Sequence, residues 1–188
     1  MVTTSDFITT TLDPALIHRS EELYTKKEFN KHTVKKDGIG QIEGNIGELF
    51  FEDYCKRMGW PIRKADQIFD YDFILGGCTI DVKTKLRESL TIPSQEFSVP
   101  YIRRDAEVDI YVGLNVTKNY PRRIQLLGFI SKEEFMSLCY YVPTGRKPNG
   151  AKIGIAMNNI INECLHPITD LFNFVHKENI PSMQMSTL

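Results

Sequence analysis

The feature that most constrains this chain is a pair of glycines, Gly76 and Gly77, between two short runs of β-branched and aromatic residues. Both positions of a two-residue primed turn need positive φ, which glycine adopts freely, so the pattern predicts a β-hairpin. Such a turn fixes the strand register. With Leu75 opposite Cys78, the pairs that follow are Ile74 with Thr79, Phe73 with Ile80, Asp72 with Asp81 and Asp70 with Lys83.

The predicted hairpin places two carboxylates, those of Asp72 and Asp81, directly opposite each other. Opposed residues have Cβ atoms about 5 Å apart, and like charges in that position repel. A bound divalent cation would turn this repulsion into attraction. Period-two alternation puts Lys83 on the same face as Asp81, with Val82 and Ile80 on the other face. The acidic pair and the lysine are therefore expected to converge.

This convergence is typical of a metal-dependent hydrolase. Mg²⁺ prefers one or two carboxylate ligands and keeps several waters, which leaves room for a phosphate oxygen and a nucleophilic water. Lys83 is suited to orient or help deprotonate that water and to offset charge on the phosphate. The alternative is a plain hairpin in which Asp70 and Lys83 form an exposed ion pair while Asp72 and Asp81 are solvated.

These residues resemble the core motif of the PD-(D/E)XK nuclease superfamily. That superfamily pairs an aspartate at the start of one strand with Asp/Glu-x-Lys on the next strand, and here these residues are Asp72 and Asp81-Val82-Lys83. A preceding helix usually supplies another acidic residue. Residues 44–50 resemble that helix, with Glu48 in the acidic position.

The resemblance continues beyond the hairpin, where residues 108–114 and 126–131 resemble the next two core strands. The chain departs from the usual pattern at Tyr71, which stands where the superfamily has proline. It also departs at Asp70, which offers a second choice for the metal-binding aspartate. The hairpin register favours Asp72 for that role.

The resemblance implies an α/β fold with a central mixed β-sheet flanked by helices, in a single nuclease domain over residues 1–188. A basic helical segment is expected over 1–40, a restriction-endonuclease-like catalytic core over 43–140, and a loop, a strand and a helix over 141–188. The implied activity is that of a Mg²⁺-dependent DNA endonuclease, with Mn²⁺ as a substitute ion. The implied metal ligands are Asp72, Asp81, Glu48 and the Val82 carbonyl, and the implied catalytic residues are Glu48, Asp72, Asp81 and Lys83.

Two alternative functions stay open at this point. Within the same superfamily the chain would be an exonuclease, which requires a free DNA end, or a junction resolvase, which acts as a homodimer. Outside enzymes it would be a nucleic-acid-binding or assembly module that kept the fold and lost catalysis. The intact acidic residues and Lys83 argue against this second alternative.

The periodicity of the sequence around Glu48 predicts a helix independently of the resemblance. At helical spacing, five residues gather on one broad face: Phe50, Phe51, Tyr54, Cys55 and Met58. Glu48 falls at the edge of that face, from which its carboxylate is expected to reach the hairpin. Gly44 and Gly47 lie about one turn apart and would allow a close approach to the start of the helix. The alternative role of Glu48 is to complement the positive N-terminus of the helix.

Local patterns predict the remaining elements. Strands are expected at 108–116, near 123–130 and over 152–157, with a loop over 86–107. The helix that carries Glu48 is expected to end at about residue 59, and a final amphipathic helix is expected over 159–178. Ser131 begins a further helix with a capping-box sequence, Ser131-Lys132-Glu133-Glu134.

The composition is that of a globular domain, since 41% of the 188 residues are hydrophobic and 25% are charged, which suffices for one core. No apolar run reaches the roughly 18 residues of a membrane span, and the N-terminus lacks a signal-peptide pattern. We therefore expect an intracellular, cytoplasmic protein with no membrane partner. Because the cysteines show no metal-ligand spacing, we expect reduced and mostly buried thiols at Cys55, Cys78, Cys139 and Cys164.

The net charge of -1 gives no global attraction to nucleic acid, so contacts with DNA must come from local basic clusters. The longest cluster, here called the N-terminal basic segment, consists of Lys26, Lys27, Lys31, Lys35 and Lys36. Shorter clusters in predicted loops are Arg103 with Arg104 and Arg146 with Lys147. We expect these residues to contact the phosphates of double-stranded DNA. The alternative for the N-terminal basic segment is a solvated helix face.

Replacing the N-terminal basic segment by alanine at all of its lysines tests this expectation. If the lysines touch phosphates, binding should weaken across all DNA sequences. The slope of log affinity against log salt should then flatten by about 0.9 per lost contact on duplex DNA. Turnover at saturating DNA should change little, because phosphate contacts position the duplex without joining the chemistry. An unchanged salt slope would identify the segment as a solvated helix face.

Overall fold

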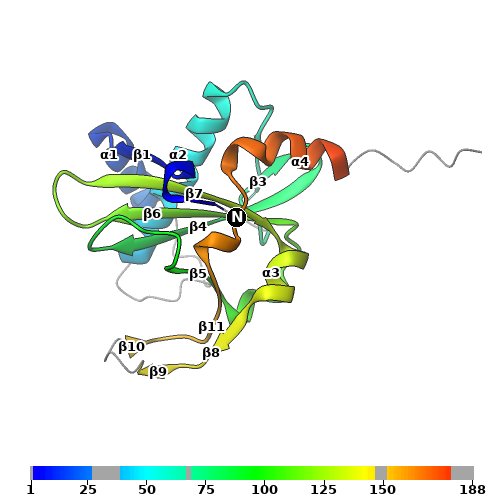
Figure 1. The fold of residues 1–188 in the computed structure, drawn as a ribbon. Helices are drawn as coiled ribbons and strands as arrows, with labels where there is room; N and C mark the ends of the chain where they lie inside the picture. The colour runs from blue at the N-terminus through cyan, green and yellow to red at the C-terminus, as the bar shows by residue number, and fades with distance from the viewer. Residues whose placement is uncertain (1, 27–38, 67–68, 147–151, 179–188) are drawn as a thin grey trace, which may run out of the picture.

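The protein has an α/β fold in which a mixed β-sheet is flanked by helices, as predicted (Figure 1). A computed structural model describes residues 2–26, 39–66, 69–146 and 152–178 of the chain. In these residues the central sheet has the strand order β1-β7-β6-β4-β3-β2. The strands are β1 (Ile8–Thr11), β2 (Arg63–Lys64), β3 (Phe73–Leu75), β4 (Cys78–Arg87), β6 (Ile110–Thr117) and β7 (Arg123–Ser131). Strands β4 and β6 are parallel, and the other neighbouring pairs are antiparallel.

The hairpin forms in the predicted register. Gly76 and Gly77 both have positive φ, 58° and 88°, as a primed turn requires. Leu75 lies opposite Cys78, and the two pairs that follow also match the prediction. The turn is packed from outside as well, since a Cβ on Gly76 would lie 2.8 Å from Cγ2 of Val175. The hairpin is therefore fixed by its own backbone and by a distant part of the chain.

Helix α2 (Ile39–Arg57) packs on one face of the central sheet, and α1 (Pro14–Lys26) packs against α2 (Figure 1). Four of the five residues predicted for its apolar face are buried: Phe50, Phe51, Tyr54 and Cys55. The prediction is wrong for Met58, which is exposed because α2 ends at Arg57.

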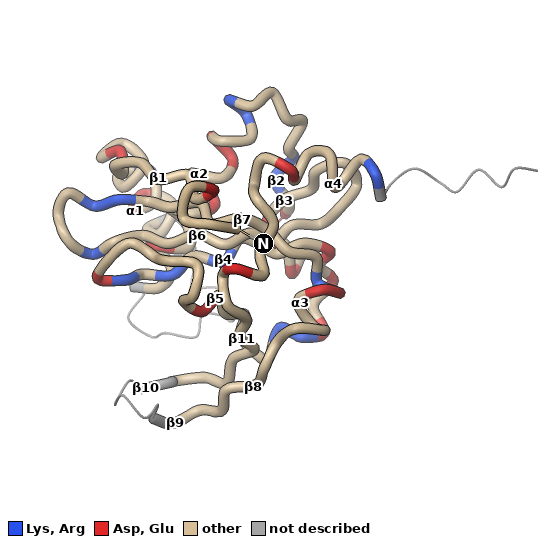
Figure 2. Tube along the Cα trace, viewed as in Figure 1, with Lys and Arg blue, Asp and Glu red and all other residues tan. Residues whose placement is uncertain are grey.

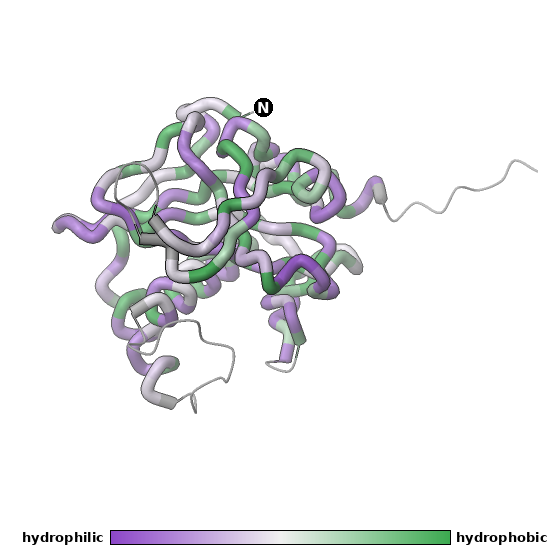
Figure 3. The backbone as a smooth tube through the Cα atoms, turned by 90° about the horizontal axis from the view of Figure 1, so that it is seen from below, coloured by the Kyte–Doolittle hydropathy of each residue, from purple (hydrophilic) through white to green (hydrophobic). Residues whose placement is uncertain are grey.

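Alternate residues of the central strands contribute to two hydrophobic cores. Val82 and Val112 belong to the core shared with α2 and α4 (Leu171–Glu178), whereas Tyr111 belongs to the core on the other side. That second core lies under α3 (Lys132–Leu138) and a smaller sheet with the order β5-β11-β8. Its strands are β5 (Glu96–Pro100), β8 (Tyr140–Val142) and β11 (Met157–Ile161). Figure 3 shows hydrophobic segments interspersed with hydrophilic ones through the body of the molecule.

The structure differs from the predicted elements in the second half of the chain. The expected loop over 86–107 contains β5. The expected strand over 152–157 is divided between two strands, the short β10 (Lys152–Ile153) and the start of β11. Strand β10 pairs with β9 (Gly145–Arg146). The expected helix over 159–178 begins instead as β11. It continues through two 3₁₀ turns, Asn162–Cys164 and Ile168–Asp170, before α4. Strand β11 pairs with both β5 and β8, so tertiary pairing overrides local propensity here.

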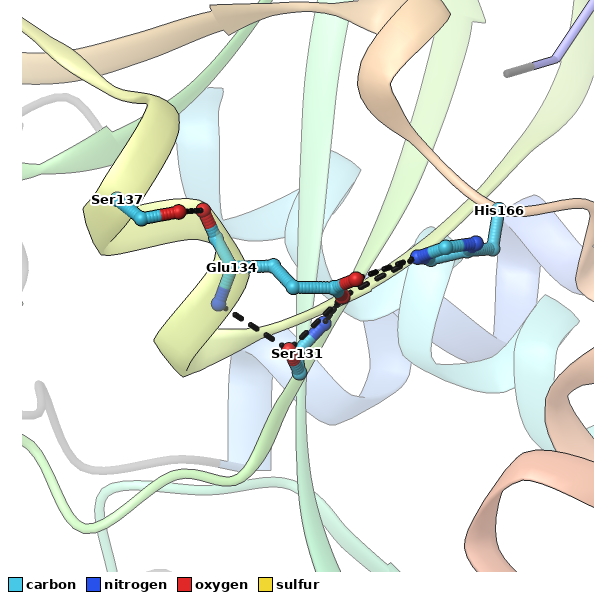
Figure 4. A network of polar contacts seen from close by, with 4 residues as sticks. All are labelled: Ser131, Glu134, Ser137 and His166. Atoms are coloured by element: carbon cyan, nitrogen blue, oxygen red, sulfur yellow. Dashed lines mark hydrogen bonds and ion pairs between the residues drawn. The ribbon is translucent and has the colours of Figure 1, made fainter.

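Ser131 caps α3 as predicted. Its Oγ accepts a hydrogen bond from the Glu134 N–H at 3.2 Å and donates to Glu134 Oε2 at 2.9 Å (Figure 4). Glu134 also meets His166, whose Nε2 lies 3.1 Å from both carboxylate oxygens. His166 in turn exchanges two backbone hydrogen bonds with Phe129 of β7. The cap therefore joins α3 to the C-terminal segment and to the central sheet.

The cysteines are free thiols, as predicted. Cys55 and Cys78 are buried, and Cys139 and Cys164 are half-buried. Burial raises the pKa of the Cys55 thiol to about 12, so that this thiol is protonated at neutral pH. Among the helices that the structure describes, none is long and apolar enough to cross a membrane.

Gly47 lets α2 approach β4 closely. A Cβ on Gly47 would lie 1.9 Å from Oγ1 of Thr84, whereas a Cβ on Gly44 would meet none of the described residues within 4 Å. The predicted close approach to the helix is confirmed at Gly47, and no described residue makes such an approach at Gly44. Because Glu48 is the next residue, this contact also sets how close Glu48 lies to the sheet.

Gly47→Ala should lower the free energy of unfolding by about 1–3 kcal/mol, since the added methyl group forces α2 away from β4. Gly44→Ala is the matched control. It should leave the free energy of unfolding unchanged or raise it by up to about 1 kcal/mol, because alanine favours a helix over glycine. Urea unfolding of both variants measures these values. Equal effects at the two positions would contradict the close packing of α2 on β4.

Candidate acidic site at the base of the hairpin

The paired ladder of the hairpin stops just before Asp72, which makes a different set of contacts. Its backbone N–H donates to the Ile80 carbonyl at 2.8 Å, and its Oδ2 accepts from the Val82 N–H at 2.7 Å. The Asp72 carbonyl accepts from the Ala65 N–H at 2.8 Å. Asp72 is thus fixed against the part of β4 that contains Asp81.

Asp81 is buried, and Lys83 offsets its charge. Lys83 Nζ lies 2.6 Å from Oδ1 and 2.5 Å from Oδ2 of Asp81. The contact at Oδ2 is an ion pair without hydrogen-bond geometry, so this oxygen makes no hydrogen bond in the described residues. The side chain of Asp81 is only 5% exposed, which leaves water little access to that oxygen. A further cation would therefore bind this oxygen only by displacing Lys83.

Glu48 reaches the same region from α2. Its Oε2 lies 3.4 Å from Nζ of Lys64 on β2, and its side chain is 19% exposed. Its negative charge is close enough to Asp72 to raise the pKa of that carboxyl. The structure therefore places Glu48 beside the hairpin, as its position at the edge of the helix face predicts.

Glu48, Asp72, Asp81 and Lys83 together form what we call the acidic site. Burial is the main cause that raises the pKa of Asp72 well above its ordinary value, and the charges of Glu48 and Asp81 add to it. The Val82 N–H and the charge of Lys83 act in the opposite direction. Ionising neighbouring buried carboxylates together is costly, and a divalent cation between them would reduce this cost.

Asp70 lies outside the acidic site. A continued register predicted it opposite Lys83, but this is wrong, because pairing ends before Asp72 and Asp70 forms an ion pair with Arg103. Lys83 binds Asp81 instead, so the alternative of an exposed Asp70–Lys83 pair is wrong as well. Of the two neighbouring aspartates, Asp72 is the one beside Asp81.

The acidic site has the ligand types that a divalent cation prefers, but its side chains are not arranged around a common point where an ion would bind. The carboxylates and the Val82 carbonyl are the oxygen ligands that Mg²⁺ takes. Across the described residues, however, no three acidic, histidine or cysteine side chains lie close enough together to hold a metal ion. Each carboxylate has a donor of its own: Lys64 for Glu48, the Val82 N–H for Asp72 and Lys83 for Asp81. Metal binding stays a prediction, and it requires these donors to be exchanged.

Only part of the predicted DNA interface lies in the described residues. Lys27, Lys31, Lys35, Lys36 and Lys147 lie outside them, and Lys26 and Arg146 are described only as the last residues of α1 and β9. Arg103 pairs with Asp70, next to the acidic site, whereas Arg104 pairs with Asp105 and covers the Tyr101 ring. Figure 2 shows basic and acidic residues interspersed along the described chain.

Tyr111 is a residue of this region that sequence reasoning missed. It lies beside Asp81 in the parallel pairing of β4 and β6 and is fully buried. Its hydroxyl has no hydrogen-bond partner in the described residues. Burial, followed by the charge of Asp81, raises the pKa of Tyr111 to about 12, while Arg103 acts in the opposite direction. No local pattern marks Tyr111, because the long connection between β4 and β6 hides which residues become neighbours.

Comparison of the chain with models of protein families, with curated proteins and with solved structures finds no match. The function has therefore to be inferred from the acidic site and from the motif that it carries.

Asp72→Asn should stabilise the protein in EDTA at neutral pH. The pKa of Asp72 in the folded protein is raised above the unfolded value of 3.8. The protonated Asp72 carboxyl therefore contributes stability that is fully present below pH 3.8 and is lost as the pH rises through the folded pKa. The variant should therefore match the wild type in acid and gain on it as pH rises. Urea unfolding at a series of pH values measures this difference.

Asp70→Asn is the matched control, because Asp70 is half-exposed and pairs with Arg103 outside the acidic site. Its stability relative to the wild type should not rise with pH in the same way. If Asp72→Asn were less stable than the wild type at neutral pH, the hydrogen bond from Val82 would outweigh the repulsion within the acidic site.

Proposed function

We propose that this protein is a Mg²⁺-dependent endonuclease that hydrolyses phosphodiester bonds in DNA. The observation that carries the proposal is the convergence of Glu48, Asp72, Asp81 and Lys83 at the base of the hairpin. In the resemblance to PD-(D/E)XK nucleases, these are the helix acid, the strand aspartate and the two ends of the Asp-x-Lys motif. A structural role alone would not require three carboxylates in one partly buried place.

The order of the elements supports the same proposal. Helix α2 with Glu48 precedes the β3–β4 hairpin, β6 and β7 follow it, and β4 is parallel to β6. The resemblance implies this order for a helix acid followed by core strands. We therefore propose a restriction-endonuclease-like core over residues 43–140, within the α/β fold.

Each residue of the acidic site would have its own role in hydrolysis. A phosphodiesterase needs an aligned water, charge relief on the phosphoryl oxygens and stabilisation of the leaving oxygen, and a bound Mg²⁺ supplies charge relief and a more acidic water. Asp72, Asp81, Glu48 and the Val82 carbonyl would hold the ion. Lys83, released from Asp81, would orient the water and donate to a phosphoryl oxygen. Burial of Asp81 keeps bulk water away, so that these charges act at low dielectric.

A substrate panel tests the proposed activity directly. The protein is incubated with supercoiled circles, linear duplex, single strands, four-way junctions and an RNA duplex, in Mg²⁺, Mn²⁺ or EDTA. Nicking or linearisation of the circles in either metal, and none in EDTA, is the expected result. Cleavage only from free ends, or only of junctions by a dimer, would identify the exonuclease or the resolvase. Metal-independent DNA binding without cleavage would overturn the proposal in favour of a binding module.

Lys83→Ala should lower the cleavage rate by about a hundredfold or more, since it removes the donor assigned to the water and the phosphate. Metal binding should persist, because the ligands remain. Asp72→Asn and Asp81→Asn should weaken metal binding as well as stop turnover. Rates on a plasmid substrate and calorimetric metal titrations measure the two effects separately.

Asp70→Asn is the control for these variants, since Asp70 lies next to Asp72 in the chain but pairs with Arg103. It should keep most of the activity. An inactive Asp70→Asn together with an active Asp72→Asn would contradict the assignment of the metal-binding aspartate.

A further inference from the structure

Strand β4 carries a row of cations that begins in the acidic site and continues away from it. Lys83, Lys85 and Arg87 alternate along β4, so their side chains leave the same face of the strand. All three line a pocket of about 160 Å³ between the central sheet and β5. One water needs only about 15 Å³ of such space, so the pocket has room for a larger group.

The backbone and side chains of β5 hold the two outer cations in the pocket. Lys85 Nζ donates to the Glu96 carbonyl at 2.9 Å and to Ser98 Oγ at 2.6 Å. Arg87 Nη2 donates to the same carbonyl at 2.8 Å. These acceptors are neutral groups, and they fix the positions of the two cations in the pocket wall.

Arg87 in particular lies in a place that favours an anion. Its guanidinium is partly buried, and in the described residues it forms no ion pair. Burial lowers the pKa of Arg87, and the charge of Glu96 only partly opposes this effect. A buried cation that lacks a counter-ion is costly, and an anion bound beside it would remove that cost.

The rest of the pocket strengthens this preference. Among the described residues, its lining contains three cations and one acidic residue, Glu96, whose carboxylate accepts a hydrogen bond from Tyr140 at 2.7 Å. Apolar side chains form much of the remaining wall: Phe97, Pro100, Leu114, Leu127 and Met157. Apolar walls lower the local dielectric, so a charge–charge contact inside the pocket is stronger than one at an open surface.

We infer that this pocket, here called the β4 phosphate pocket, binds a backbone phosphate of the substrate strand next to the phosphate at the acidic site. The inference rests on the proposed function for the identity of the ligand. Lys83 belongs to both places, which makes the pocket continuous with the acidic site. Lys83 and Arg87 are four residues apart, about 13 Å along an extended strand, so the row can follow more than one phosphate of one nucleic-acid chain.

Binding of a short DNA single strand in EDTA tests the β4 phosphate pocket without relying on cleavage. Lys85→Gln and Arg87→Gln should each weaken binding by about tenfold, the loss expected for one charged contact. The slope of log affinity against log salt should flatten by about 0.7 per lost contact on a single strand. Lys118→Gln is the matched control, because Lys118 is an exposed cation near the end of β4 that pairs with Glu88. Its affinity and its slope should equal those of the wild type.

Two further variants separate this inference from the proposed function and from folding. Asp81→Asn removes a carboxylate that pairs with Lys83, so it should not weaken binding in EDTA even though it stops cleavage. Loss of binding in Lys85→Gln and Arg87→Gln would therefore support the pocket even if neither the wild type nor any variant cleaved DNA. Arg87→Lys keeps the charge and should keep most of the affinity. Wild-type binding by Lys85→Gln and Arg87→Gln would overturn the inference, whatever the cleavage assays show. Equal losses of affinity in Arg87→Lys and Arg87→Gln, together with a lowered thermal midpoint of both variants, would also overturn the inference. Impaired folding would then explain the losses.

Discussion

The turn at Gly76 and Gly77 is the constraint on which the rest of the structure depends. Its two positive φ angles fix the register of β3 on β4, and the register decides which side chains meet at the open end of the hairpin. Slipping β4 by one residue would put Val82 in the place of Asp81 and turn the lysine to the opposite face. The acidic site exists because a backbone preference of two residues is transmitted along the hairpin to Asp72.

The site is nevertheless assembled from more than the hairpin. Gly47 lets α2 come close enough to β4 for the charge of Glu48 to reach Asp72. The Val82 N–H holds the Asp72 carboxylate, and Lys83 holds Asp81, so the negative charges are stabilised by groups of the chain itself. An ion that enters such a site competes with these internal donors, and its affinity is set by the difference between the two sets of contacts.

Local patterns predicted the parts of the structure that are themselves local. The hairpin register, the apolar face of α2 and the cap at Ser131 each follow from residues within a few positions of one another. Strand β5 and the neighbourhood of Tyr111 were missed, because they depend on pairing between segments far apart in the chain. The position of Asp70 differs from the prediction for another reason: the regular pairing of the hairpin ends before Asp72, whose carboxylate accepts a hydrogen bond from the Val82 N–H of β4.

The close approach of Val175 to Gly76 has a consequence for folding during synthesis, because the two residues lie in segments that are made at different times. The hairpin has local contacts and emerges early in synthesis, whereas α4 is among the last described elements to appear. Once α4 docks, Val175 covers the outside of the turn, and a Cβ on Gly76 would then lie only 2.8 Å from Cγ2 of Val175. The docking of α4 therefore adds to the protection of the hairpin against local opening, although the two segments lie far apart in the chain.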